Sequence, residues 1–306
     1  MGKNMGKNRP LHKHKNEARR GRNRFLRKQE RIAYLFLAPS LIGVSIFVLL
    51  PFCDAVRRSF YEAMSGKYVG FDNYITVFKN EAFQMAARNT LRFTFTCIPI
   101  LLVISLLFAV IISGFKKTGD FFKATFLVPM AIPVASIVLL WNVFFHQNGL
   151  INVILIHFGG KGIDFMNTDK AFYVLVFTYV WKNVGYDMVL WLAGLSGISD
   201  SYYEAAKVDG AGAFAIFRYI TLPSLRPTIY ITAVLSLVNS FKAFREAYLI
   251  AGSYPHESIY MMQHLFNNWF VALDIQKMCA AAVVMAIVVI ILVLLLQRIG
   301  GRDENA

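Results

Sequence analysis

The stretch Glu204-Ala205-Ala206-Lys207-Val208-Asp209-Gly210, followed by Ile220-Thr221-Leu222-Pro223, lies in a mostly polar loop between two apolar stretches of the chain. Alanine favours helix, and glycine allows the left-handed turn that often ends one. The segment therefore predicts a short helix, a turn at Gly210 and a second short helix. A membrane protein has little reason to carry such a motif on an aqueous face unless another protein docks there.

We expect the first of these helices to begin at Ser201. The spacing of Ser201 and Glu204 has the form of a capping box, in which each side chain accepts from the other residue's amide. The second helix should run through Phe214 and Phe217 and end near Pro223. Small alanines at the centre of the first helix allow a partner surface to approach closely.

The composition outside this loop is that of a polytopic membrane protein. Hydrophobic residues make up 57% of the chain and charged residues only 16%, which disfavours a soluble domain. About 20 apolar residues are needed to cross the hydrocarbon of a bilayer. Uncharged runs cover residues 32–53, 93–115, 124–160 and 278–297, and two further candidate spans at 171–195 and 228–250 contain charges. The sequence predicts an all-α integral membrane protein with six transmembrane helices.

Two features of this layout concern breaks and loops. Pro129 and Pro133 lie four residues apart and could break the third helix, because proline removes a backbone hydrogen bond. We expect residues 124–145 to cross the membrane and residues 147–149 to turn into an outer segment. A short surface helix is expected at residues 80–88, within the loop that follows the first span.

The net charge of +14 is concentrated in the N-terminal tail. Twelve Lys and Arg residues precede residue 32, which is typical of a cytoplasmic anchor beside a membrane span rather than of nucleic-acid binding. Six crossings then place both termini in the cytoplasm, although the outer loop at residues 54–92 carries six basic residues and disagrees with this orientation. The predicted organisation is a basic tail at 1–31, a transmembrane domain at 32–298 and a short tail at 299–306, with no removable leader.

No catalytic or metal-binding pattern accompanies these helices. The cysteines Cys53, Cys97 and Cys279 have neither metal-ligand spacing nor a disulfide framework. Lys161 is followed by Gly162 rather than by Ser or Thr, so the nearby glycines do not form a phosphate loop. The sequence predicts no metal, no cofactor and no enzyme, and any ATP must be bound and hydrolysed by a partner.

The loop resembles the conserved cytoplasmic loop of permease subunits of binding-protein-dependent ABC importers. That pattern reads Glu-Ala-Ala, three residues, Gly, nine residues, Ile, one residue, Leu-Pro, and every fixed position is matched. Asn89-Thr90 at the start of the second helix and Gly70-Phe71-Asp72-Asn73-Tyr74 in the outer loop extend the resemblance. Together with Leu195 they are similar to the carbohydrate branch, which includes maltose, glycerol-phosphate and multiple-sugar permeases.

The resemblance implies a type I importer bundle with a core at residues 89–298 and a coupling loop at 196–227, in the plasma membrane of a bacterium. It implies a second permease subunit, two ATP-binding cassette subunits, an extracellular solute-binding protein and a sugar substrate, with no nucleic-acid partner. The implied coupling residues are Ser201, Glu204, Ala205, Ala206, Gly210, Ile220, Leu222 and Pro223. An amphipathic helix on the membrane surface and a DNA-reading helix-turn-helix are the alternatives for this loop.

Charged residues inside the predicted fourth and fifth helices mark a candidate path. Each charge placed centrally in a membrane costs roughly 2.5–3.5 kcal/mol on insertion scales, so these side chains should face protein or water. Lys242 and Glu246 are four residues apart and could pair along one helix face. The candidate path residues are Trp181, Asn183, Asp187, Asn239, Lys242, Arg245, Glu246 and Tyr248. Alternatively, such pairs lock helices together, or the fifth helix ends near Lys242.

Two other functional classes remain open from the residues alone. An ion-coupled secondary carrier could use Lys182, Asp187 and Glu246 as a relay, although no internal repeat of the kind such carriers show is evident. A membrane scaffold that transports nothing is the weaker alternative. The sequence does not distinguish a sugar from a glycerophosphodiester.

Overall fold

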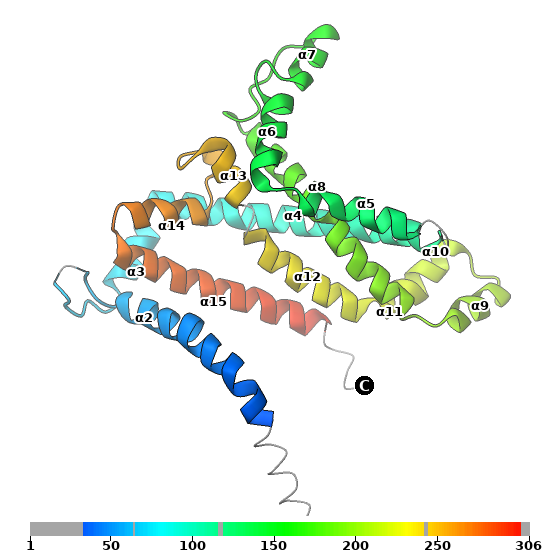
Figure 1. Cartoon of the computed structure of the whole chain (residues 1–306), viewed down its shortest axis with the longest axis horizontal. Helices are drawn as coiled ribbons and strands as arrows, with labels where there is room; N and C mark the ends of the chain where they lie inside the picture. Colours follow the sequence, from blue (N-terminus) through cyan, green and yellow to red (C-terminus); the bar gives the residue numbers. More distant parts are fainter. Residues whose placement is uncertain (1–32, 64, 116–118, 242–243, 301–306) are drawn as a thin grey trace, which may run out of the picture. The chain divides into compact units, whose positions relative to one another are not determined.

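The computed structural model describes residues 33–63, 65–115, 119–241 and 244–300 (Figure 1). Within these ranges every regular element is a helix, and extended chain pairs only in one antiparallel bridge between Tyr61 and Tyr68. The prediction of an all-helical protein is confirmed for this part of the chain. The predicted terminal tails, except for residues 299 and 300, lie outside the described residues. The contacts divide the chain into two units, Met1–Arg58 and Ser59–Ala306.

The first unit contains one helix that is long and apolar enough to cross a membrane. It runs from Ala33 to Arg58 over 26 residues. A π-helical turn, η1 (Ser45–Leu49), precedes the last part of this helix, α2 (Leu50–Arg58). Pro51 has no backbone N–H to donate, and a π turn is a known way for a helix to accommodate a missing bond. The predicted first span therefore forms as a helix.

The second unit is built around two long helices, α4 (Glu81–Ser113) and α8 (Lys170–Ser196), which pack against each other (Figure 1). Helix α5 (Gly119–Ala131) packs on α8, and α12 (Arg226–Ser240) contacts α4, α8 and α15 (Ile275–Gly300). The shorter helices are α3 (Asp72–Lys79), α13 (Phe244–Ala251), η4 (Glu257–Ile259) and α14 (Met262–Val271).

Four helical segments of the described chain are long and apolar enough to span a bilayer. They are Ala33–Arg58, Glu81–Ser113, Val134–His157 and Ile275–Arg298. A fifth span arises if Ala213–Ser224 and Arg226–Tyr248, which are bent by 67°, are counted as one. Helix α8 is not among them, in keeping with the charges that it carries. Six crossings and the orientation of the termini therefore remain predictions.

The third predicted helix is broken at its prolines. Helix α5 ends at Ala131, and α6 (Val134–Phe145) begins after Pro133, whose backbone (φ −57°, ψ 139°) is not helical. The suggested proline break is therefore confirmed, and the apolar segment that is long enough to span a membrane begins after it, at Val134. Residues 146–149 turn into α7 (Leu150–His157), as predicted.

The start of α4 also differs from expectation. Asn80 caps α4 by accepting a hydrogen bond from the Phe83 amide at 3.0 Å, so residues 81–88 belong to the long helix and not to a separate surface helix. The predicted fifth helix corresponds to α12, which ends at Ser240, and α13, which begins at Phe244. The alternative in which that helix ends near residue 242 concerns residues 242 and 243, which lie outside the described part of the chain.

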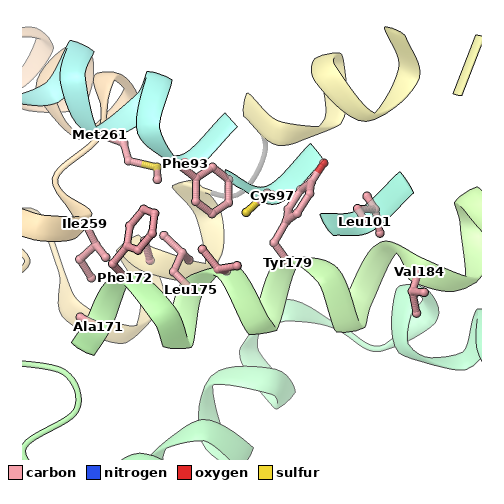
Figure 2. Close-up of a cluster of buried hydrophobic side chains, with 12 residues drawn as sticks. Phe93, Cys97, Leu101, Ala171, Phe172, Leu175, Tyr179, Val184, Ile259 and Met261 are labelled. Atoms are coloured by element: carbon pink, nitrogen blue, oxygen red, sulfur yellow. The ribbon is translucent and has the colours of Figure 1, made fainter. Parts of the chain in front are cut away.

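Packing between α4 and α8 forms the largest cluster of buried side chains (Figure 2). The rings of Phe93 on α4 and Tyr179 on α8 meet edge to face with centroids 5.4 Å apart. Asn89 Nδ2 donates to the carbonyl oxygens of Glu257 and Tyr260 at 2.6 and 2.9 Å. The motif residue Asn89 therefore ties the segment before α14 to the N-terminal part of α4.

Glycine permits two close helix crossings on α8. A Cβ at Gly185 would lie 1.9 Å from the backbone oxygen of Phe126 on α5, and a Cβ at Gly194 would lie 2.3 Å from Thr228 Oγ1 on α12. Both positions are closed to any larger residue unless a helix moves. Helix α8 is thus pressed against α5 near its middle and against α12 near its end.

Candidate coupling loop and translocation cavity

The helix-turn-helix predicted for the polar loop forms. Helix α9 (Asp200–Val208) is followed by α10 (Ala213–Ile216), a π turn η2 (Phe217–Thr221) and α11 (Leu222–Ser224). The predicted capping box is wrong, because the N-cap is Ser199, whose backbone is extended (φ −63°, ψ 133°) and whose side chain makes no capping bond. Ser201 lies inside the first turn, and its hydroxyl is 2.8 Å from that of Ser199.

The end of α9 is set by Gly210, as the sequence predicts. The Ala211 amide donates to the Ala206 carbonyl at 2.9 Å, and the Gly210 amide donates to the Lys207 carbonyl at 3.1 Å. This pair of bonds is the Schellman arrangement, which requires the left-handed backbone that Gly210 adopts (φ +78°). No atom lies within 4 Å of the position that a Cβ at Gly210 would occupy. Only backbone conformation therefore selects glycine here.

The loop is fastened to the helix bundle at its second half. Thr221 is buried, and its hydroxyl lies 3.3 Å from the Tyr203 hydroxyl on α9. Leu225 directly follows α11 and is fully buried in a cluster with Met188 and Trp191 of α8. Trp191 in turn donates from Nε1 to Ser105 Oγ on α4 at 2.8 Å. A chain of contacts thereby links α9 to α8 and α4.

The exposed surface of this loop carries more large apolar side chains than is usual for a surface in contact with water. Val208 is 87% exposed and Phe214 is 80% exposed, and Tyr202 and Tyr219 are also exposed. Exposed apolar surface of this kind marks contact with another protein or a membrane. Of the predicted coupling residues, Ser201, Glu204, Ala205 and Gly210 are exposed, whereas Ala206, Ile220, Leu222 and Pro223 are half-buried.

A cavity of about 170 Å³ lies beside the middle of α8. Four of the eight candidate path residues, Asn183, Asn239, Arg245 and Glu246, line it together with Lys182. Lys182 Nζ donates to Glu246 Oε1 at 2.5 Å, which joins α8 to α13. Glu246 therefore has a partner on another helix, and Lys242, the partner expected from spacing, lies outside the described residues.

Three further candidate path residues, Trp181, Asp187 and Tyr248, are not part of the cavity lining. The ring of Trp181 packs on that of Trp141 in α6, with centroids 5.5 Å apart. Asp187 is 1% exposed between α8 and α12, where Ser236 Oγ donates to its Oδ2 at 2.6 Å. The Tyr248 hydroxyl is 3.5 Å from that of Ser253.

Four lining residues were missed by reasoning from the sequence. They are Met130, Leu175, Thr178 and Tyr179. Residues 175, 178, 179, 182 and 183 follow the spacing of one helix face. Extending that spacing backward from the two polar residues at 182 and 183 would have found three of the four.

A second, polar pocket of about 360 Å³ lies among the loops around residues 142–147, 164–167 and 254–256. Hydrogen bonds from the Asn167 side chain and amide and from Gln147 lower the pKa of Asp164 to about 2. Asn152, 1% exposed, donates to three carbonyls of these loops at 2.8–3.1 Å and accepts from the Ile163 amide at 2.8 Å. Within the described ranges no group of three or more His, Cys, Asp or Glu side chains could hold a metal ion.

Long apolar helices, a charged cavity beside the middle of α8 and an exposed apolar loop define a helical membrane permease. The chain belongs to the family of binding-protein-dependent transport system inner membrane components, whose model matches residues 89–302. It is therefore a multi-pass membrane protein.

Curated relatives and solved structures agree with this family. The chain is 30% identical to the probable ABC transporter permease protein YesP of Bacillus subtilis, over 80% of this chain and 84% of that protein. It is 30% identical to the trehalose/maltose transport system permease protein MalF of Thermococcus litoralis, over 74% and 79%. It is 33% identical to the sn-glycerol-3-phosphate transport system permease protein UgpA of Escherichia coli, over 69% and 73%. A crystal structure of a bacterial ABC transporter involved in the import of the acidic polysaccharide alginate has the same fold, with a TM-score of 0.77 and 23% identity over 90% of this chain and 97% of that one.

The family resemblance drawn from the loop is confirmed. The chain is a permease subunit of an ABC importer and not an enzyme, because in this family ATP hydrolysis resides in partner subunits. The ion-coupled carrier finds no support among these relatives.

Proposed function

We propose that this chain translocates a saccharide across the plasma membrane of a bacterium, as one of two permease subunits of an importer. A solute-binding protein delivers the saccharide from outside, and two ATPase subunits bind the ATP. Relatives that are named as trehalose/maltose, lactose and arabinooligosaccharide permeases support a saccharide. The chain crosses the membrane six times, with both termini in the cytoplasm.

The observation that carries this proposal is the construction of the loop. Helix α9 presents an exposed carboxylate at Glu204, and the neighbouring Tyr203 contacts Thr221, which lies in the part of the loop that Leu225 fastens to the packed core. A short helix that is exposed on one side and fastened to the bundle on the other is suited to transfer the motion of a docked subunit to the bundle. We infer that α9 sits in a cleft of an ATPase subunit and follows its closure on ATP.

The cavity beside α8 is the proposed translocation path. Helix α8 has 27 residues, and Lys182 lies twelve residues after its start, which places the cavity about 18 Å along a helix of about 40 Å. Asn183, Asn239 and the Tyr179 ring suit a saccharide, because amides bind hydroxyls and an aromatic ring packs on the apolar face of a pyranose. The cavity of about 170 Å³ is smaller than the roughly 300–1,000 Å³ of most ligand sites, so passage requires the helices to separate.

Substitution of Glu204 tests the proposal. Loss of a hydrogen bond to a charged group costs about 1.5–3 kcal/mol, so Glu204→Gln should lower the coupling of ATPase activity to saccharide uptake about tenfold or more. The matched control is Asp200→Asn, which removes an exposed carboxylate one turn earlier on the same helix. Both are measured in the complete importer in proteoliposomes, with its solute-binding protein loaded.

The expected result is impaired uptake with Glu204→Gln and uptake within about twofold of the unsubstituted importer with the control. Equal uptake in all three would show that α9 does not carry the coupling. Copurification of the ATPase subunits with each variant distinguishes failed assembly from failed coupling.

A further inference from the structure

The charges that line the cavity do not cancel. Lys182 and Glu246 form an ion pair at 2.5 Å, and both side chains are largely buried. Arg245 precedes Glu246 on α13, lines the same cavity and is exposed. Within the residues that the structure describes, the Arg245 guanidinium has no carboxylate partner. One positive charge is therefore left in the lining.

An unbalanced cation in this position needs an explanation. Charged side chains inside a membrane protein are costly, face a bundle interior or a water-filled cavity, and mark substrate pathways. The ion pair restrains Lys182, because its ammonium is already held by Glu246. Among the described residues no carboxylate holds Arg245 in this way, so its guanidinium is the group available to a solute.

The chemistry of arginine narrows the class of solute that this cavity can bind. A guanidinium is planar, remains charged at all physiological pH values and presents parallel N–H donors that match the two oxygens of a carboxylate or phosphate group. A neutral hydroxyl gains little from this geometry. The nearby amides of Asn183 and Asn239 remain suited to the hydroxyls of a saccharide ring.

We infer that the cavity selects saccharides that carry a carboxylate, sulfate or phosphate group, with Arg245 as the group that binds the anion. This inference rests on the proposed transport function and adds the charge of the solute. The relatives do not decide it, since their named solutes include neutral sugars and the anionic sn-glycerol-3-phosphate.

The test identifies the solute without assuming it. A host strain that lacks this chain is complemented with the unsubstituted chain, Arg245→Gln, Arg245→Lys or Arg298→Gln. Each strain receives a mixture of neutral and acidic oligosaccharides, glycerol phosphate and sulfated glycosides, and mass spectrometry measures which solutes are removed from the medium. Arg298→Gln is the matched control, because it removes the same charge from an exposed position in the last turn of α15.

We expect every solute whose uptake requires this chain to be anionic. Arg245→Gln should lower that uptake at least tenfold, Arg245→Lys should retain part of it, and Arg298→Gln should retain it all. Copurification of the importer subunits should be unchanged in each variant.

Three results would overturn the inference. Uptake of neutral saccharides only would show that the residual charge does not select the solute, and full anion uptake by Arg245→Gln would show that this residue does not bind it. A complex that loses its second permease subunit in Arg245→Gln would assign the arginine to a subunit contact. If no solute depends on the chain, the proposed function itself fails, which is a distinct outcome.

Discussion

Replacement of Gly210 by alanine should raise the population of opened forms of the coupling loop, and backbone conformation alone sets the size of that increase. Gly210 has φ +78°, and no atom lies within 4 Å of where its Cβ would be, so no steric clash contributes. An L-residue in the left-handed region costs about 1–2 kcal/mol, which lowers the population of the observed loop relative to opened forms about 5- to 30-fold.

Trypsin measures this change, because Lys207 and Arg218 are exposed on either side of the turn. Cleavage tracks the open population when the loop recloses faster than it is cut. In the permease purified without its ATPase subunits, Gly210→Ala should be cleaved after Lys207 and after Arg218 about 5- to 30-fold faster than the unsubstituted chain.

The matched control is Gly212→Ala, two residues further on. Gly212 also has no atom within 4 Å of a Cβ, but its backbone (φ −71°, ψ 162°) suits any residue. Alanine there restricts the unfolded chain and should leave cleavage unchanged or slow it up to about fivefold. Equal acceleration by both substitutions, or by neither, would refute the argument from the left-handed turn.

Three further predictions concern packing and the outer loops. Gly185→Ala should destabilise the detergent-purified protein by about 1–3 kcal/mol or more, measured by thermal unfolding, because the new Cβ would meet a main-chain oxygen of α5. The control Gly197→Ala should have little effect, because its Cβ would be 3.4 Å from its nearest neighbour. Asn152→Ala should lower the local stability of the loops by about 1–3 kcal/mol and speed hydrogen exchange over residues 146–164. The control Asn148→Ala, at an exposed position, should change neither. Equal exchange in both variants would contradict the role given to the buried Asn152 amide. The pKa of Asp164 is lowered from 3.8 to about 2, so the ionised carboxylate stabilises the loop fully above about pH 4, and this stabilisation is lost as the pH falls toward 2. Hydrogen exchange in the loop should therefore depend on pH in this range, and Asp164→Asn should abolish that pH dependence.

Features governed by neighbours in sequence were predictable. The apolar runs are long enough to determine helices, Pro133 breaks the third of them, and Gly210 ends α9 with a left-handed residue, all as expected from local chemistry. The errors of this kind concern helix ends. The N-cap of α9 is Ser199 rather than Ser201, and the helix expected at residues 80–88 continues without a break into α4.

Features governed by distant parts of the chain were not predictable. Spacing within one helix suggested Lys242 as the partner of Glu246, whereas the structure pairs Glu246 with Lys182, 64 residues away. Four of the seven candidate path residues that the structure describes reach the cavity lining, and no local pattern separates them from Asp187, which bonds to Ser236 on another helix. The importance of Gly185 is visible only once α5 is in place.

The crossing at Gly185 limits how the bundle can rearrange during a transport cycle. Residues three positions from Gly185 share its face of α8, so sliding α5 along α8 by about one turn would bring the Phe126 oxygen to Lys182 or Met188, which carry side chains, instead of a bare Cα. These two helices must therefore travel together, pivoting at most about that point of contact. Relative motion of α5 and α6 is then expected at the non-helical junction at residues 132 and 133, where no helical hydrogen bond has to be broken.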